Sequence, residues 1–207
     1  MIKLEHVVLA SSEQMEFIIQ GLRNPMNSWE KSDSDCLFHM FQNYSNDDPM
    51  AEAYTRYLDE FGLNLKIGPN DHSLMQRLAN SGTDHRKFMR MIPVYVRITA
   101  PLYWWKEFDT YKVGSVANSC STMHKIHEKE FTLEDFSTDH LLDFSLNRLA
   151  DTIGQLNYCR EKFINYDPEE EKIRHPAMQY EKKDYWWQMI QLLPSNYNQT
   201  RNVMMNY

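Results

Sequence analysis

The 207-residue chain is poor in cysteine and glycine and has no excess of positive charge. Its only cysteines, Cys36, Cys120 and Cys159, are odd in number and lack C-x-x-C spacing, so neither a disulfide framework nor a cysteine zinc site is indicated. The formal net charge of -7 argues against general binding to nucleic acid or to membrane surfaces. A mononucleotide ligand remains compatible with this charge, and a reducing cytoplasm fits the cysteines best.

Long apolar runs are also missing. No stretch approaches the roughly 18 apolar residues that cross a bilayer, and the N-terminus MIKLEHVVLA lacks the apolar centre of a signal peptide. The hydrophobic fraction of 42% nevertheless predicts a folded chain, since that much apolar surface can offset the entropy cost of ordering. We expect an α+β protein with a single domain over residues 1–207, or one large domain plus an excursion.

A strand followed by a helix organises the middle of the chain. Met91 to Thr99 alternate side chains in a run rich in Val, Ile and Tyr, which predicts a strand with one buried face. Thr99 offers an N-cap and Pro101 fits the first helical turn, so we expect a helix from Ala100 or Pro101 to about Tyr111.

Periodicity and turn residues predict the remaining elements. A first strand is expected at Ile2–Leu9, and Arg23 is expected to be exposed near the end of the helix that follows it. Because two strands do not make a stable sheet, others must come from Leu37–Phe41, Leu63–Ile67 or Gly114–Asn118. Helices are expected at Ser12–Leu22, Asp47–Gly62, Asn70–Asn80, Thr138–Asn165 and Tyr180–Leu193.

Two polar clusters could be taken for a metal site or an acid-base site, but both have simpler explanations. His124-x-x-His127 could place two imidazoles on one helix face, yet no third ligand follows at a recognisable distance, so solvated histidines are expected. The pair Glu134-Asp135 follows Thr132, a good helix cap, and is explained by helix-end electrostatics. We therefore assign no metal site.

A larger pattern extends from His85 to Met123. It consists of a His, a strand, Ala-Pro, an aromatic-rich helix, a polar turn with Ser and then Asn-Ser. This order resembles the signature region of the flavin-dependent thymidylate synthases, the ThyX family. In that family the helix runs into R-H-R-x-x-S and then N-E-x-S-x-R-Y, where this chain has T-Y-K-V-G-S over 110–115 and A-N-S-C-S-T-M over 117–123.

A second resemblance lies near the C-terminus. Leu193-Pro194 follows a predicted helix, and Thr200-Arg201 comes a few residues later. ThyX sequences have a similar Leu-Pro and an arginine that helps to hold the nucleotide phosphate, although the spacing here is one residue longer. The family continues into a helix with Asn and Arg residues, a motif without a counterpart before Tyr207.

The resemblance implies reductive methylation of dUMP, in which a nicotinamide cofactor such as NADPH reduces FAD and methylenetetrahydrofolate donates the carbon. It also implies a homotetramer, because ThyX active sites collect residues from several subunits. No catalytic residue is assigned. By resemblance, substrate and phosphate contacts are expected from Glu107, Ser115, Asn118, Cys120 and Arg201, and cofactor contacts from His85, Tyr111, Lys112 and Val113.

The substitutions in the motifs leave several functions open. Thr110, Lys112 and Thr122 stand where the family has arginines, and lysine cannot reproduce the bidentate contacts of arginine with phosphate. Losing two charged contacts of about 1.5–3 kcal/mol each would weaken binding by roughly two to four orders of magnitude. Four alternatives therefore stay open: a synthase, a divergent flavin or nucleotide enzyme, a non-catalytic ThyX-like protein that binds a nucleotide or another protein, and a protein for which the resemblance is misleading.

Overall fold

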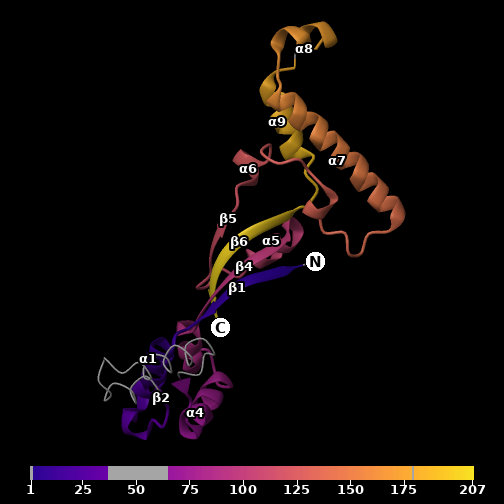
Figure 1. Cartoon of the computed structure of the whole chain (residues 1–207). Coiled ribbons are helices and arrows are strands. Elements are labelled where there is room, and N and C mark those ends of the chain that lie inside the picture. Colours follow the sequence, from indigo (N-terminus) through magenta and orange to yellow (C-terminus); the bar gives the residue numbers. More distant parts are fainter. Residues whose placement is uncertain (1, 37–64, 179) are drawn as a thin grey trace, which may run out of the picture. The chain divides into compact units, whose positions relative to one another are not determined.

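The computed structural model describes residues 2–36, 65–178 and 180–207. These residues form an α+β structure with a four-stranded sheet in the order β1-β4-β6-β5 (Figure 1). Arg97 bonds to Asn202 and Thr99 to Thr200, so β4 and β6 run in opposite directions. The strands are β1 (Lys3–Leu9), β4 (Pro93–Pro101), β5 (Val116–Ser119) and β6 (Asn198–Asn206).

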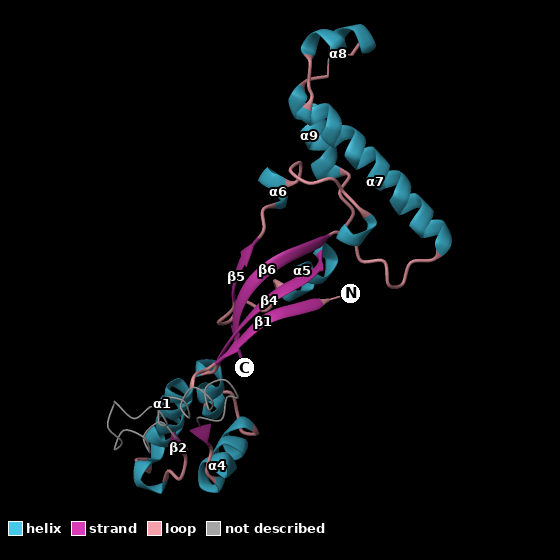
Figure 2. Cartoon of the chain, viewed as in Figure 1, coloured by secondary structure: helices cyan, strands magenta, loops and turns pink. Residues whose placement is uncertain are grey.

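The chain divides into two compact units. The large unit comprises Met1–His6 and Val96–Val203, and the small unit comprises Val7–Tyr95 and Met204–Tyr207. Figure 2 shows the helices of each. Those of the large unit are α5 (Leu102–Phe108), α6 (Thr122–Lys125), η4 (Leu133–Asp135), α7 (Asp143–Ile164), α8 (Pro168–Arg174) and α9 (Lys182–Gln191). The small unit has α1 (Ser12–Arg23), η1 (Asn24–Met26), η2 (Trp29–Lys31), α4 (Pro69–Ala79) and η3 (His85–Met91), with the antiparallel pair β2 (Asp35–Cys36) and β3 (Leu65–Lys66).

The core of the large unit lies between α7 and α9. Leu149, Leu156 and Cys159 of α7 are buried against Tyr185 and Met189 of α9. The three buried residues of α7 keep the three- and four-residue spacing of one helix face. The helix itself begins at Asp143, later than the predicted Thr138, and α9 is likewise shorter than the predicted Tyr180–Leu193.

The N-terminus of helix α5 is capped by a distant segment of the chain, and the prediction that Thr99 caps it is wrong. Thr99 does not cap it, because this residue lies within β4 and its hydroxyl bonds to Thr200 at 2.7 Å. The first free N–H groups of the helix instead donate to the segment before β6, from Leu102 to the Tyr197 carbonyl and from Tyr103 to the Ser195 carbonyl. The helix ends at Phe108, short of the predicted Tyr111.

Helix α1 forms as its sequence predicts. Ser11 makes a capping box with Gln14, which satisfies backbone N–H groups at the start of the helix. The stripe of Ile18, Ile19 and Leu22 is buried, and it shares a core cluster with residues of α4 and η3.

Arg23 is buried rather than exposed, contrary to the prediction. Its Nε lies 2.6 Å from Asp71 Oδ1, and both side chains are almost completely inaccessible to solvent. Asp71 also accepts hydrogen bonds from the Ser32 hydroxyl and from the backbone N–H groups of Asp33 and Ser34. The segment 32–35, which reads as a solvated turn, is therefore held by a carboxylate at the start of α4.

The sheet contains one strand that was not predicted. Strand β5 overlaps the predicted segment Gly114–Asn118, whereas the polar stretch of β6 gave no strand signal. Strand β3 overlaps the predicted segment Leu63–Ile67 but pairs with β2, outside this sheet. The predicted strand Leu37–Phe41 and helix Asp47–Gly62 lie outside the described residues. No helix in the described ranges has the length and apolar character needed to traverse a bilayer.

Candidate functional site

The loop between α5 and β5 carries the most motif residues. Backbone N–H groups of Thr110 and Tyr111 donate to the carbonyls of Glu107 and Phe108, which continues the helix end as a turn. Gly114 then adopts a φ of 72°, and the Ser115 hydroxyl donates to the Tyr111 carbonyl. The loop is thereby folded back on itself before β5 begins.

This loop borders a cavity of about 290 Å³. Three residues predicted from the motif therefore come together, namely Tyr111, Lys112 and Ser115. Lys112 has no ion-pair partner within the described parts of the chain. The cavity is lined by Phe108, Asp109, Tyr111, Lys112, Ser115, Val116 and Ala117.

Arg201 lies beside this cavity but is already engaged. Its Nη1 is 2.8 Å from Asp109 Oδ1, and Asp109 lines the cavity. Its Nε donates to Gln199 Oε1 at 2.9 Å, and its guanidinium lies 4.2 Å from the centre of the Trp105 ring. Of its five N–H donors, two make these bonds, so further donors remain for a ligand.

Backbone contacts join the end of β5 to this network. The Cys120 N–H donates to the Thr200 carbonyl, and the Cys120 carbonyl accepts from Gln199 Nε2, each at 3.0 Å. The Cys120 thiol is exposed. Cys120 thus contributes to the site through its backbone.

The other predicted residues do not line the cavity. Glu107, Val113 and Asn118 are all exposed, and none of them contacts the enclosed space. His85 belongs to the small unit, where it borders a separate cavity of about 370 Å³ together with Leu22 and Phe88. The α5–β5 loop therefore brings together only some of the residues that were predicted to contact a substrate or cofactor.

The two histidines of His124-x-x-His127 lie in different surroundings. His124 is exposed in α6, while His127 packs its ring against Phe163 with centroids 4.9 Å apart. The Nδ1 of His127 is buried without a hydrogen-bond partner among the described residues. No group of three His, Cys, Asp or Glu side chains suited to a metal occurs in the described ranges.

Sequence reasoning missed Asp109 and Gln199. Asp109 and Arg201 are 92 positions apart in the sequence. Neither residue belongs to a motif, and only the pairing of β6 with its neighbours brings them together. No local signal in the sequence could have identified this contact.

The Gly114→Ala variant is expected to destabilise the loop by about 1–2 kcal/mol, because a φ of 72° places Cβ close to the following carbonyl oxygen. Chemical denaturation would measure the loss. Gly82→Ala is the control, since nothing lies within 4 Å of a Cβ built at that position. Equal effects of the two substitutions would contradict the proposed loop geometry.

Comparisons with known proteins support the fold but find no close relative. No protein-family model and no curated protein matches the chain. The crystal structure of thymidylate synthase X from Helicobacter pylori with FAD and dUMP is similar with a TM-score of 0.51 at 14% identity, covering 99% of this chain and 77% of that one. A second Helicobacter pylori ThyX structure, complexed with FAD and dUMP, gives 0.50 at 13% identity, covering 99% and 78%. The chain therefore has an α+β fold like that of the ThyX thymidylate synthases.

Proposed function

We propose that the cavity beside the α5–β5 loop binds a nucleoside monophosphate similar to dUMP. The observation that carries this proposal is that Tyr111, Lys112 and Ser115 line one cavity, with the Lys112 ammonium unpaired among the described residues. An ammonium attracts a phosphate, and an exposed tyrosine ring can stack on a base. The similar solved structures, which contain dUMP, support the same ligand class.

Lys112 is the main phosphate contact in this proposal, and Arg201 assists it. Because Asp109 already neutralises Arg201 and itself borders the cavity, the guanidinium offers a phosphate less net attraction than a free arginine would. Trp105 and Gln199 hold the guanidinium in place. Arg201 can therefore donate in a fixed direction while Lys112 supplies the charge.

A flavin fits this site only in part. A volume of about 290 Å³ is at the lower end for small-molecule sites, so the cavity suits a mononucleotide and is too small for all of FAD. Tyr111 and Lys112 could hold a ring and one phosphate of the dinucleotide. When bound, FAD would supply hydride chemistry; this chain would bind and orient the ligands.

The proposed cofactor site therefore requires a second copy of the chain. Strand β1 is at the edge of the sheet, and its Leu4, Val7, Val8 and Leu9 side chains are more than half exposed. An apolar edge strand of this kind favours association. A homotetramer remains our prediction; light scattering at the monomer mass of 24.8 kDa would contradict it.

The Lys112→Ala variant is expected to bind dUMP roughly 10- to 150-fold more weakly, because it loses a charged contact with the phosphate. Arg201→Ala should weaken binding less, since Asp109 already pairs with this arginine. Calorimetric titration of dUMP into each variant would measure both effects. Lys106→Ala is a matched control on α5 that does not line the cavity, and equal affinities for Lys106→Ala and Lys112→Ala would refute the site.

An enzymatic role rests on the same site and has its own test. The chain would act as a flavin-dependent thymidylate synthase, or as a divergent flavin enzyme, only if it also binds FAD. A yellow purified protein that converts dUMP with NADPH and methylenetetrahydrofolate would establish the synthase. A colourless protein stabilised by dUMP would instead identify a non-catalytic nucleotide-binding protein.

A further inference from the structure

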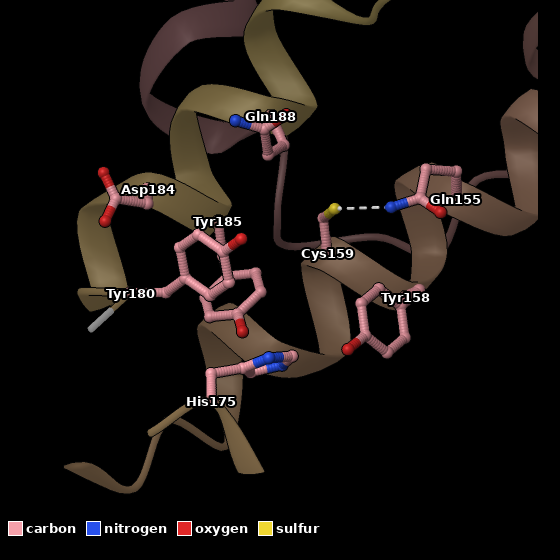
Figure 3. Close-up of a pocket in the computed structure, with 8 residues that line it drawn as sticks. All are labelled: Gln155, Tyr158, Cys159, His175, Tyr180, Asp184, Tyr185 and Gln188. Carbon is pink, nitrogen blue, oxygen red and sulfur yellow. Dashed lines mark hydrogen bonds between the residues drawn. The ribbon is translucent and has the colours of Figure 1, made fainter. Parts of the chain in front are cut away.

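A larger cavity, of about 560 Å³, lies among α7, α8 and α9 in the large unit (Figure 3). None of its lining residues belongs to the nucleotide site proposed above. They are Gln155, Tyr158 and Cys159 of α7, His175 after α8, Tyr180, and Asp184, Tyr185 and Gln188 of α9.

Aromatic rings form much of the wall. The Tyr180 ring lies 5.1 Å from His175 and 6.2 Å from Tyr185, with interplanar angles of 71° and 65°. Rings at such angles face in different directions around the enclosed space. Tyr158 lines the cavity from α7 (Figure 3), so three tyrosines from separate turns contribute to its wall.

One carboxylate, that of Asp184, lines this cavity, and a second, that of Glu171, lies behind the Tyr185 and His175 side chains that line it. Glu171 is only 4% exposed, and its Oε1 accepts from the Tyr185 hydroxyl at 2.5 Å and lies 3.7 Å from His175 Nε2. Neither partner is a lysine or an arginine. Asp184 lines the cavity directly.

Basic side chains do not offset these carboxylates. Among the described residues that line the cavity there is no lysine or arginine. Arg174 interacts with Tyr158, but its Nη2 is 2.5 Å from Glu170 Oε1 and is therefore neutralised. Of the described lining residues, only His175 has a side chain that could carry a positive charge.

Cys159 and Tyr185 keep their protons at neutral pH. Burial raises the pKa of the Cys159 thiol, and burial together with the hydrogen bond to Glu171 raises the pKa of the Tyr185 phenol. A neutral thiol is a weak nucleophile, which favours binding over covalent chemistry. The phenol keeps its proton to donate to Glu171.

We propose that this cavity binds a small organic cation, such as a methylated ammonium, against the rings of Tyr158, Tyr180 and Tyr185, with the carboxylate of Asp184 in the same wall. Aromatic faces attract cations through their quadrupole, and quaternary ammonium groups are recognised by such cages of aromatic side chains. The volume is within the range of small-molecule sites. This proposal is independent of the nucleotide site.

The test compares a cation with its neutral counterpart. Choline, tetramethylammonium and 3,3-dimethylbutan-1-ol, which has the shape of choline without its charge, are titrated into the full chain and followed by calorimetry. Choline should bind saturably in the millimolar range or tighter, and the neutral alcohol should bind at least about 5-fold more weakly. Equal binding of choline and the alcohol, or no saturable binding of either cation, would overturn the proposal.

Amino-acid substitutions test whether choline binds in this cavity. Tyr158→Leu and Asp184→Asn should each weaken choline binding about 3- to 30-fold. Tyr103→Leu and Asp151→Asn are matched controls on exposed helix positions outside the cavity, and they should leave the affinity unchanged. Choline binding should also survive Lys112→Ala, so failure of the nucleotide site would not be mistaken for failure of this one. A loss shared by the variants and their controls would refute the assignment.

Discussion

Asp71→Asn is expected to lower the stability of the small unit by about 3–5 kcal/mol, because it leaves the buried Arg23 guanidinium without its counter-charge. The Asp71 side chain is fully buried and accepts four hydrogen bonds, from Arg23, Ser32, Asp33 and Ser34. An amide can accept at one oxygen only, so the network cannot be restored. Hydrogen exchange of the α1 and α4 amides would measure the loss locally.

Graded and control variants keep this prediction testable if Asp71→Asn does not fold. Ser32→Ala removes one hydrogen bond to the same carboxylate and should cost about 1 kcal/mol. Asp84→Asn changes an exposed carboxylate of the same unit and should stay within about 0.5 kcal/mol of the parent. If Asp84→Asn and Asp71→Asn had similar effects, the ion pair would not be a major source of stability.

The same carboxylate predicts a dependence on pH. Burial opposes ionisation of Asp71, but hydrogen bonds from Ser34, Ser32 and Arg23 outweigh it and lower its pKa from 3.8 to about 2. Because the pKa of Asp71 is lower in the folded chain than in the unfolded chain, its ionisation stabilises the folded state at pH values above the unfolded pKa. This contribution to stability is lost as the pH falls from about 4 to about 2. It amounts to about 2 kcal/mol, and acid titration of Asp71→Asn should show its absence.

Trp105→Ala is expected to lower the stability of the large unit by about 3–5 kcal/mol. Trp105 is 1% exposed, its Nε1 donates to the Gln199 carbonyl at 2.9 Å, and the Arg201 guanidinium covers its ring. The substitution opens a cavity between α5 and β6 and leaves a buried carbonyl without its donor. Urea denaturation, with hydrogen exchange of the β6 amides, would measure both effects.

A second substitution separates packing from hydrogen bonding. Trp105→Phe keeps much of the ring but loses the Nε1 donor, so it should cost about 1–3 kcal/mol. Tyr103→Ala, at a side chain 54% exposed on the same helix, is the control and should cost much less. A loss from Tyr103→Ala as large as that from Trp105→Ala would show that Trp105 does not anchor α5.

Part of the candidate site could be predicted because its residues are neighbours in the chain. Tyr111, Lys112 and Ser115 follow one helix, and a single glycine turn suffices to bring them to one cavity. Arg201 is different, since its contact with Asp109 spans 92 positions. The sequence pattern indicated Arg201 as a candidate, but gave no sign of the carboxylate that neutralises it.

Elements with local signals could be predicted from the amino-acid sequence alone. Helix α1 follows from Ser11 and its apolar stripe, the buried face of α7 follows from helical spacing, and β4 follows from alternation along the chain. These signals need only a few adjacent residues. They were sufficient to predict an α+β fold.

Only the tertiary structure decided which polar residues enter the interior. Strand β6 is rich in asparagine, which disfavours strands, yet it forms between β4 and β5, where both neighbours satisfy its backbone. Arg23 is buried because Asp71, from a distant helix, compensates the cost of removing its charge from water. Such compensation depends on partners far apart in the chain, and for that reason local sequence patterns could not predict it.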